Sequence, residues 1–168
     1  MTVRPGKIYT DHIIVQKSGV HGKGLYAVED IPRNVRIIEY IGDKVTKTES
    51  DRRADRQIQK SKNNKSGAVY IFTLNSKYDI DGNVPENTAR FINHSCSPNC
   101  EVVIISNRLW VVSKRKIKKD EELTYDYGFD FDNFSAHPCR CGSENCAGFI
   151  VASKYRTKLK KILSEKNK

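Results

Sequence analysis

The chain has 168 residues, of which 38% are hydrophobic and 30% are charged. This length suits one domain with a substantial hydrophobic core. No apolar run approaches the roughly 20 residues of a membrane span, and residues 1–7 lead into no apolar signal core, so the sequence predicts an intracellular protein without a membrane anchor.

Positive charge is concentrated in two segments. Lys and Arg number 30 against 20 Asp and Glu, a net charge of +10. Residues 44–66 hold eight basic residues against three acidic ones, and residues 152–168 hold seven against one. Such clustering favours acidic partners, including nucleic acid or nucleoprotein. Solvated basic faces on ordinary surface helices would give the same composition.

Short strands joined by turns are predicted along the first half of the chain. The expected strands are His12–Val15, a strand ending at Val28, Val35–Ile41, Ala68–Leu74 and Tyr78–Gly82. Before Val28, Gly19, Gly22 and Gly24 allow close approach of the backbone to a ligand, although a plain hairpin turn would explain them equally. Thr48–Lys60 reads as an exposed helix, because it is almost wholly polar.

The second half continues the same pattern and ends in a helix. The expected elements are helical turns in Pro85–Phe91, strands Glu101–Ile105 and Leu109–Ser113 joined through Asn107, a strand ending in Leu123–Gly128, and a basic C-terminal helix with Leu159, Ile162 and Leu163 on its inner face. Many short strands with few helices predict a mostly β fold with a minor α contribution.

The cysteines indicate a metal site rather than disulfides. There are five, an odd number, and none precedes Cys96, whereas a secreted disulfide framework is normally paired and spread along the chain. Cys139, Cys141 and Cys146 supply three thiolates within eight residues. Structural zinc takes four tetrahedral ligands, so the fourth must be Cys96 or Cys100. The spacing does not choose between them.

The stretch Asn87–Cys100 is dense in polar and metal-ligating groups. Asn93 and His94 could stabilise the loop, but their place beside a metal anchor favours contact with a ligand. Tyrosines also recur on or beside the predicted strands, at Tyr40, Tyr70, Tyr125 and Tyr127. Four hydroxyl-bearing rings suggest an aromatic channel that desolvates a cation and still offers hydrogen bonds.

Four motifs stand in the order and spacing of the SET-domain protein-lysine methyltransferases. They are Gly22–Tyr26, Arg90–Cys100, Glu122–Gly128 and Cys139-x-Cys141-x4-Cys146, the last of which resembles the post-SET segment. The resemblance runs from about His12 to Phe149 and is strongest to the trithorax-like branch. It implies an N-terminal extension (1–11), a SET domain (12–133) with a variable insert (44–67), a post-SET zinc segment (134–150) and a basic C-terminal helix (151–168).

The resemblance also implies a fold and a site. The fold would consist of several small β-sheets with a knot-like threading of the C-terminal strand, with S-adenosylmethionine on one face and a lysine channel entering from the other. The residues implied to bind the cofactor are His21, Gly22, Lys23, Gly24, Leu25, Tyr26, Arg90, Asn93, His94, Tyr127 and Phe149, and Phe149 would also close the channel. Tyr127 matches the catalytic tyrosine, Tyr40 and Tyr70 match channel positions, and Tyr125 matches the position that varies between tyrosine and phenylalanine. The zinc ligands would be Cys96, Cys139, Cys141 and Cys146.

The implied activity is methylation of a lysine in a histone or histone-like protein, mainly monomethylation with some dimethylation because Tyr125 retains its hydroxyl. The basic insert favours an acidic peptide flank or a nucleic-acid-bound target, whereas Asp130 and Asp132 favour a basic peptide. Two alternatives stay open: an inactive chromatin-binding module with this fold, and a small zinc-stabilised nucleic-acid-binding domain. The sequence does not decide between cytoplasm and nucleus.

Overall fold

The computed structural model describes residues 7–64 and 69–166. The strands are β1 (Ile13–Lys17), β2 (Lys23–Ala27), β3 (Arg36–Tyr40), β4 (Asp43–Thr46), β5 (Ile71–Thr73), β6 (Tyr78–Asp81), β7 (Asn93–His94), β8 (Cys100–Ile105), β9 (Arg108–Ser113) and β10 (Thr124–Tyr125). The helices are α1 (Lys47–Asn64), α2 (Arg156–Lys166) and the short 3-10 turns Thr10–His12, Thr88–Phe91, Phe134–Ala136 and Ser153–Tyr155. None of the described helices is both long and apolar enough to span a membrane.

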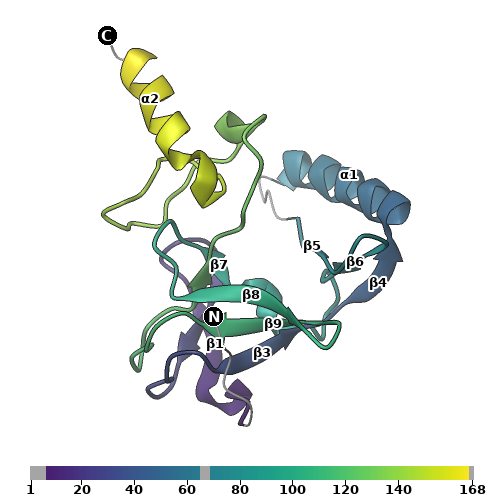
Figure 1. Cartoon of the computed structure of the whole chain (residues 1–168), viewed down its shortest axis with the longest axis vertical. Coiled ribbons are helices and arrows are strands. Elements are labelled where there is room, and N and C mark those ends of the chain that lie inside the picture. The colour runs from purple at the N-terminus through teal and green to yellow at the C-terminus, as the bar shows by residue number, and fades with distance from the viewer. Residues whose placement is uncertain (1–6, 65–68, 167–168) are drawn as a thin grey trace.

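The strands form small separate sheets, as Figure 1 shows. Two sheets have three strands, in the orders β3-β9-β8 and β4-β6-β5, and two have a pair of strands, β1-β2 and β7-β10. All pairings are antiparallel except that of β7 with β10, which is parallel. The prediction of a mostly β fold with a minor helical contribution is confirmed.

The hydrophobic core lies around the β3-β9-β8 sheet. The central strand β9 is buried along all but its first residue, and it has a hydrogen-bonded partner strand on each edge. Ile37 of β3, Val111 of β9 and Leu25 of β2 are fully buried in one cluster with Leu123. Leu123 directly precedes β10, so the core fixes the chain at the point where it enters the candidate site.

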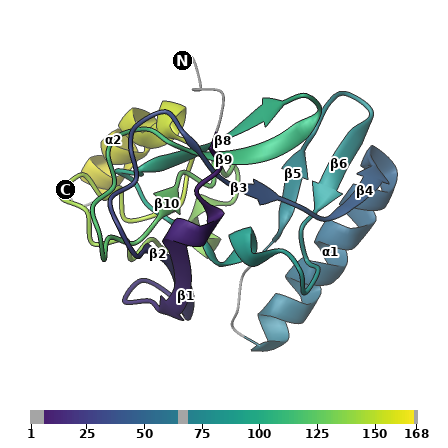
Figure 2. The ribbon, with the colours of Figure 1, turned by 90° about the horizontal axis from the view of Figure 1, so that it is seen from below.

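The two helices lie well apart, on different sides of the molecule (Figure 1, Figure 2). Helix α1 is anchored to the β4-β6-β5 sheet by ion pairs. Lys47 pairs with Asp79, and Arg53 Nη1 lies 2.7 Å from Asp43 and 3.0 Å from Asp81. The predicted exposed helix at 48–60 is confirmed, and it continues to Asn64.

Two predicted strands are shorter than expected. The strand at 68–74 is confined to β5, and Ala68 lies outside the described residues. The strand expected at 123–128 is limited to Thr124–Tyr125, because its partner β7 has only two residues. After it the Asp126 side chain accepts the N–H of Gly128, which has a φ of 68°, and the chain turns.

Candidate active site

The parallel pairing of β7 with β10 creates the candidate site. Its register sets Asn93 opposite Thr124 and His94 opposite Tyr125. Asn99 reinforces this junction, because its buried amide donates to the carbonyl oxygen of Glu122 and accepts the N–H of Thr124, each at 2.8 Å. The polar stretch that the sequence singled out is therefore joined to the tyrosine-bearing segment.

A cavity of about 340 Å³ opens at this junction. Its walls come from the glycine-punctuated turn, from β7, from the second residue after β10 and from the C-terminal segment. The lining residues are Val20, His21, Asn93, His94, Tyr127, Ala136, His137, Pro138, Cys139, Arg140, Cys141 and Ile150. Four of the predicted cofactor-binding residues thus share one cavity, namely His21, Asn93, His94 and Tyr127.

The glycine-punctuated turn is held at the cavity by Asn93 and Glu122. The Asn93 amide nitrogen lies 3.0 Å from the carbonyl oxygen of Lys23 and 2.7 Å from Oε1 of Glu122. Glu122 also accepts hydrogen bonds from the hydroxyls of Ser18 and Tyr26, at 2.8 and 3.0 Å. One carboxylate thereby connects both arms of the turn to the asparagine of β7.

This arrangement leaves no room for a side chain at position 24 unless the Glu122 carboxylate moves. A Cβ on Gly24 would lie 2.3 Å from Oε1 of Glu122, far closer than non-bonded atoms tolerate. Gly22 has a φ of 52°, in the left-handed region that favours glycine. Glycine is thus favoured at the two positions for different reasons: lack of space at Gly24 and a left-handed backbone conformation at Gly22.

Other predicted cofactor residues lie elsewhere. Among the described residues, the cavity lining includes Val20 and His21 of the turn but not the 22–26 segment, and Leu25 is fully buried in the core. The Arg90 guanidinium donates to the carbonyl oxygen of Val84 at 2.9 Å, outside the lining. Direct contact of these residues with a cofactor stays a prediction.

Phe149 belongs to a different cluster from the tyrosines. Its ring centroid is 5.2 Å from that of Phe134, and its backbone pairs with Pro138. The next residue, Ile150, lines the cavity instead. The structure therefore brings the segment to the site, while contact of Phe149 with a cofactor or a lysine channel stays a prediction.

Aromatic rings form a continuous run through the predicted channel residues. Tyr40 contacts Phe72 with centroids 4.7 Å apart, Phe72 contacts Tyr125 at 5.6 Å, and Tyr125 contacts Tyr127 at 5.0 Å. The Tyr40 hydroxyl donates to the carbonyl oxygen of Tyr70 at 3.0 Å. All four predicted tyrosines are thus brought together, and Phe72 joins them.

Burial keeps the hydroxyls of this run neutral. Desolvation raises the pKa of Tyr40, Tyr125 and Tyr127 above the ordinary value, and the neighbouring tyrosines raise it further. The Tyr127 hydroxyl donates to the carbonyl oxygen of Ile92 at 3.1 Å. Neutral hydroxyls in such a wall can exchange hydrogen bonds but do not act as anionic bases near pH 7.

His94 connects the tyrosine segment to the cysteines. Its Nδ1 accepts the N–H of Tyr127 at 3.2 Å, so the proton of the neutral ring is on Nε2, 3.5 Å from Sγ of Cys96. Burial lowers the pKa of His94 to about 4, although Asp126 acts in the opposite direction. The ring therefore serves as a neutral bridge.

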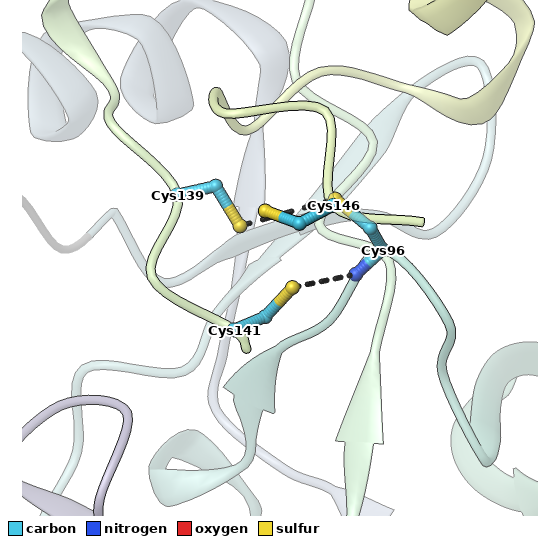
Figure 3. A group of neighbouring side chains, drawn as sticks. All are labelled: Cys96, Cys139, Cys141 and Cys146. Carbon is cyan, nitrogen blue, oxygen red and sulfur yellow. Dashed lines mark hydrogen bonds between the residues drawn. The ribbon is translucent and has the colours of Figure 1, made fainter. Parts of the chain in front are cut away.

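Four cysteines converge on one point. The Sγ atoms of Cys96, Cys139, Cys141 and Cys146 all lie within 4.8 Å of one another, and Figure 3 shows them turned inward from separate parts of the chain. Cys96 and Cys139 are 3.8 Å apart, which matches the edge of about 3.8 Å of a tetrahedron with zinc–sulfur bonds of about 2.3 Å. The residues therefore fit a four-thiolate metal site.

The structure separates the two candidates for the fourth cysteine. Cys100 is fully buried in the main hydrophobic core, where desolvation raises the pKa of its thiol. Cys96 has its N–H 3.4 Å from Sγ of Cys141 and packs in the smaller cluster with the C-terminal segment. Cys96 is thus the cysteine that joins the C-terminal triad.

Several lining residues escaped the sequence-based prediction. His137 and Pro138 directly precede Cys139, and a metal-anchored segment could have been expected to carry its neighbours to the site. Hydrogen bonds from Ile150 to the His137 carbonyl oxygen and from Cys139 to that of Gly148 shape this wall, at 2.8 and 2.9 Å. Glu122 stands in the Glu122–Gly128 motif, but its hydrogen bonds to the glycine-punctuated turn and to Asn93 depend on contacts between distant segments, as does the place of Phe72 in the aromatic run.

Known proteins resemble most of the chain. The family model described as SET domain matches residues 22–128. Similar proteins include a histone-lysine N-methyltransferase described as H3 lysine-4 specific from Aspergillus oryzae, 44% identical over 140 residues, which are 80% of this chain and 11% of that protein. Others are histone-lysine N-methyltransferase 2D of Homo sapiens, 36% identical over 143 residues (82% and 2%), and histone-lysine N-methyltransferase trithorax of Drosophila virilis, 34% identical over 146 residues (84% and 4%).

The chain thus spans between 2% and 11% of the length of these curated relatives. The matched segment includes the glycine-punctuated turn from Gly22, the Asn93-His94 strand and the tyrosines up to Tyr127. The resemblance to the trithorax-like branch is confirmed by the relative of that name. The chain belongs to the SET domain family.

Proposed function

We propose that this chain is an S-adenosylmethionine-dependent protein-lysine N-methyltransferase. One observation carries the proposal: Tyr127 both lines the 340 Å³ cavity and contacts Tyr125 at the end of the aromatic run. A group bound in the cavity and a side chain lying along the aromatic run would meet at this tyrosine. The relatives named as histone-lysine N-methyltransferases support the same reaction class.

The cavity fits a cofactor of this size and offers it polar groups. Its volume is within the roughly 300–1,000 Å³ of small-molecule sites. Asn93 and His94, 7% and 3% exposed, offer polar groups on one wall, and the Glu122 carboxylate fixes Asn93 there by accepting its amide hydrogen bond at 2.7 Å. When bound, S-adenosylmethionine supplies a methyl group on a positively charged sulfur.

The aromatic residues would prepare the substrate lysine. Methyl transfer requires a neutral amine, and enclosure among Tyr40, Phe72 and Tyr125 disfavours the ammonium form and lowers its pKa. The neutral Tyr127 hydroxyl and the Ile92 carbonyl oxygen would orient donor and acceptor. Alignment of two bound reactants can lower a barrier by roughly 7–11 kcal/mol.

Nearby carboxylates offset many of the cations in the first part of the insert, although the insert as a whole is basic. Between residues 43 and 59, and in the facing strand β6, six carboxylates offset five cations: Asp43, Glu49, Asp51, Asp55, Asp79 and Asp81 against Lys44, Lys47, Arg52, Arg53 and Arg56. Four of these cations are ion-paired. Lys60, Lys62 and Lys65 add three further cations to the insert, and the structure does not describe their side chains. Asp130 and Asp132 are exposed beyond Tyr127, so we propose a histone or histone-like tail as the substrate.

The product is mainly monomethyl-lysine in this proposal. Tyr125 is only 8% exposed and lies between Phe72 and Tyr127. Its hydroxyl occupies space that a methylated amine would need. We also propose zinc as the ion of the four-cysteine site, because the ligand set is wholly thiolate.

The basic C-terminal helix is proposed to contact nucleic acid or nucleoprotein, in a nuclear setting. Lys158, Lys160 and Lys161 are exposed on α2, and exposed lysines contribute to binding that weakens as salt rises. Replacement of all three by alanine should reduce both the affinity for a DNA duplex and its salt slope. An unchanged slope would count against this contact.

The principal test is transfer of a labelled methyl group from S-adenosylmethionine to a histone H3 tail peptide and to whole histones. We expect transfer by the unmodified chain and a loss of at least about 100-fold in Tyr127→Phe. Binding of S-adenosylhomocysteine by both forms, with no transfer to any histone, would favour the alternative of an inactive chromatin-binding module.

A further inference from the structure

The C-terminal helix directs one of its cations inward. Arg156, the first residue of α2, leaves only 16% of its side chain exposed. Its guanidinium donates from Nη1 to the carbonyl oxygen of Cys96 at 2.5 Å and from Nη2 to Oδ2 of Asp126 at 2.7 Å. One side chain of α2 thus joins two segments of the site that are far apart in the sequence.

Asp126 is the centre of a small hydrogen-bond network beside Tyr127. Its carboxylate accepts the backbone N–H of Gly128 and of Ser153, each at 3.1 Å, in addition to Arg156. Its Oδ1 lies 3.8 Å from Nδ1 of His94, the atom that accepts the N–H of Tyr127. Because Nδ1 of His94 carries no proton, Asp126 does not hold the ring directly. Asp126 immediately precedes Tyr127, so a fixed carboxylate restrains Tyr127 and, through the Tyr127 N–H, His94, and both of these residues line the cavity.

The second anchor of Arg156 is the loop that supplies a metal ligand. The Cys96 carbonyl oxygen accepts its hydrogen bond, while the Cys96 sulfur belongs to the four-cysteine cluster. Leu159, one turn further along α2, is fully buried in the same cluster as Cys96 and Ala147. The apolar face of α2 thus packs against the cysteine-bearing cluster. From the first turn of the helix, Arg156 contacts the Cys96 loop and Asp126.

We propose that Arg156 is a positioning residue of the active site. Its planar fork sets the Cys96 loop and the Asp126 segment at a fixed separation, so that His94 and Tyr127 keep their places in the cavity wall. Helix α2 is then a structural part of the active site as well as a basic surface. This inference rests on the proposed methyltransferase function for its activity readout, but not for its metal and cofactor readouts.

Arginine suits this role better than lysine. Two diverging N–H groups can address a carbonyl oxygen and a carboxylate at once, whereas an ammonium is a single point charge. Removal of the guanidinium also leaves the partly buried Asp126 carboxylate without its cationic partner. Outer-shell partners of metal ligands typically alter affinity or activity by about 10–100-fold when they are lost.

The test compares four variants of the full chain. Arg156→Ala removes the guanidinium and both of its hydrogen bonds. Arg156→Lys keeps the positive charge but not the two diverging N–H groups. Lys160→Ala removes an exposed cation from the same helix. Leu159→Ala weakens the packing of α2 against the smaller cluster but leaves the Arg156 guanidinium in place. For each we would measure kcat and KM, the affinity for S-adenosylhomocysteine, the rate of zinc release to a chelating dye and the Tm, with all rates taken well below the lowest Tm.

We expect Arg156→Ala to lower kcat by about 10–100-fold and to accelerate zinc release by about 10-fold, with partial rescue in Arg156→Lys. Lys160→Ala, assayed on a histone H3 tail peptide without nucleic acid, should stay within about twofold of the unmodified chain. Leu159→Ala should lower the Tm and change kcat clearly less than Arg156→Ala does. The proposal is overturned if Arg156→Ala changes only the Tm, or if Leu159→Ala changes kcat and zinc release as much.

Arg156→Lys decides the matter if Arg156→Ala does not fold, because unchanged kcat and zinc release in that variant would overturn the proposal. Absence of transfer by the unmodified chain counts against the proposed function instead. In that case zinc release and S-adenosylhomocysteine affinity still decide whether Arg156 positions the site.

Discussion

The backbone N–H of Tyr127 donates a hydrogen bond to Nδ1 of His94 at 3.2 Å, while the opposite ring nitrogen lies 3.5 Å from the sulfur of Cys96. This single ring joins the candidate catalytic tyrosine to the candidate metal site. Disturbance at the cysteines should therefore reach the tyrosine, because a buried, close-packed ring cannot move independently of its two partners.

Loss of the fourth cysteine should remove the metal and the activity together. Cys96→Ser places a weaker ligand among the three remaining sulfurs, so zinc affinity should fall by more than about 100-fold. Metal content by mass spectrometry and methyl transfer on the same samples would show the two losses in parallel. The matched control is Cys100→Ala, since Cys100 is fully buried in the separate main core. That variant should lose about 1–2 kcal/mol of stability and keep its zinc; loss of zinc from it would contradict the ligand assignment.

Removal of the Tyr125 hydroxyl should raise the number of methyl groups transferred. The Tyr125 ring lies between Phe72 and Tyr127, with centroids 5.6 and 5.0 Å away. Tyr125→Phe keeps the ring but frees the space of one hydroxyl, so di- and trimethyl products should increase. Mass spectrometry of a methylated peptide measures this, with Tyr78→Phe as the control. A mainly trimethyl product from the unmodified chain would refute the underlying assignment.

Glu122 should control the affinity for the cofactor. Its carboxylate accepts hydrogen bonds from Ser18, Tyr26 and Asn93. In Glu122→Gln the side-chain amide has only one oxygen to accept these bonds, and its NH2 group would face the same donors. Hydrogen bonds to a charged group contribute about 1.5–3 kcal/mol each, so the Kd for S-adenosylmethionine should rise by about 10-fold or more.

Isothermal titration of Glu122→Gln with the cofactor would measure that change. Glu29→Gln is the control, because the Glu29 side chain is 62% exposed and contacts His12 instead of Ser18, Tyr26 or Asn93. Equal affinity in the two variants would mean that the turn keeps its shape without the carboxylate.

The ion pair between Lys47 and Asp79 should make stability depend on acid pH. Burial would raise the pKa of the Asp79 carboxyl, but hydrogen bonds from Lys47 and Ser50 outweigh it and hold the pKa below its ordinary value of 3.8. Because the folded-state pKa is depressed, the contribution is present above about pH 4 and is lost as the pH falls through the folded-state value. Asp79→Asn should therefore be less stable near pH 7, by about 1–3 kcal/mol.

Urea unfolding between pH 7 and pH 2.5 would test this. The free energy of unfolding of the unmodified chain should fall more steeply below pH 4 than that of Asp79→Asn, so that the two curves converge. Parallel curves would show that Lys47 does not stabilise the charged carboxylate.

The sequence alone determined the features that depend on local order. Alternating apolar residues and turn-forming residues predicted most strands, including the hairpin of β8 and β9. The turn of this hairpin is Ser106-Asn107, where both φ angles are positive. The spacing of Cys139, Cys141 and Cys146 predicted a metal triad, because three thiolates within eight residues have few other uses. Four motifs in register indicated the family.

Only the tertiary structure decided what depends on distant contacts. It brought Cys96 rather than Cys100 to the triad, because β8 carries Cys100 into the main core. It set the ring of Phe149 against Phe134 and away from the tyrosines. It turned Arg156 inward, although composition had counted it with the basic tail. Each outcome depends on which segments pack together, and the energy of such packing is shared among residues that the sequence keeps far apart.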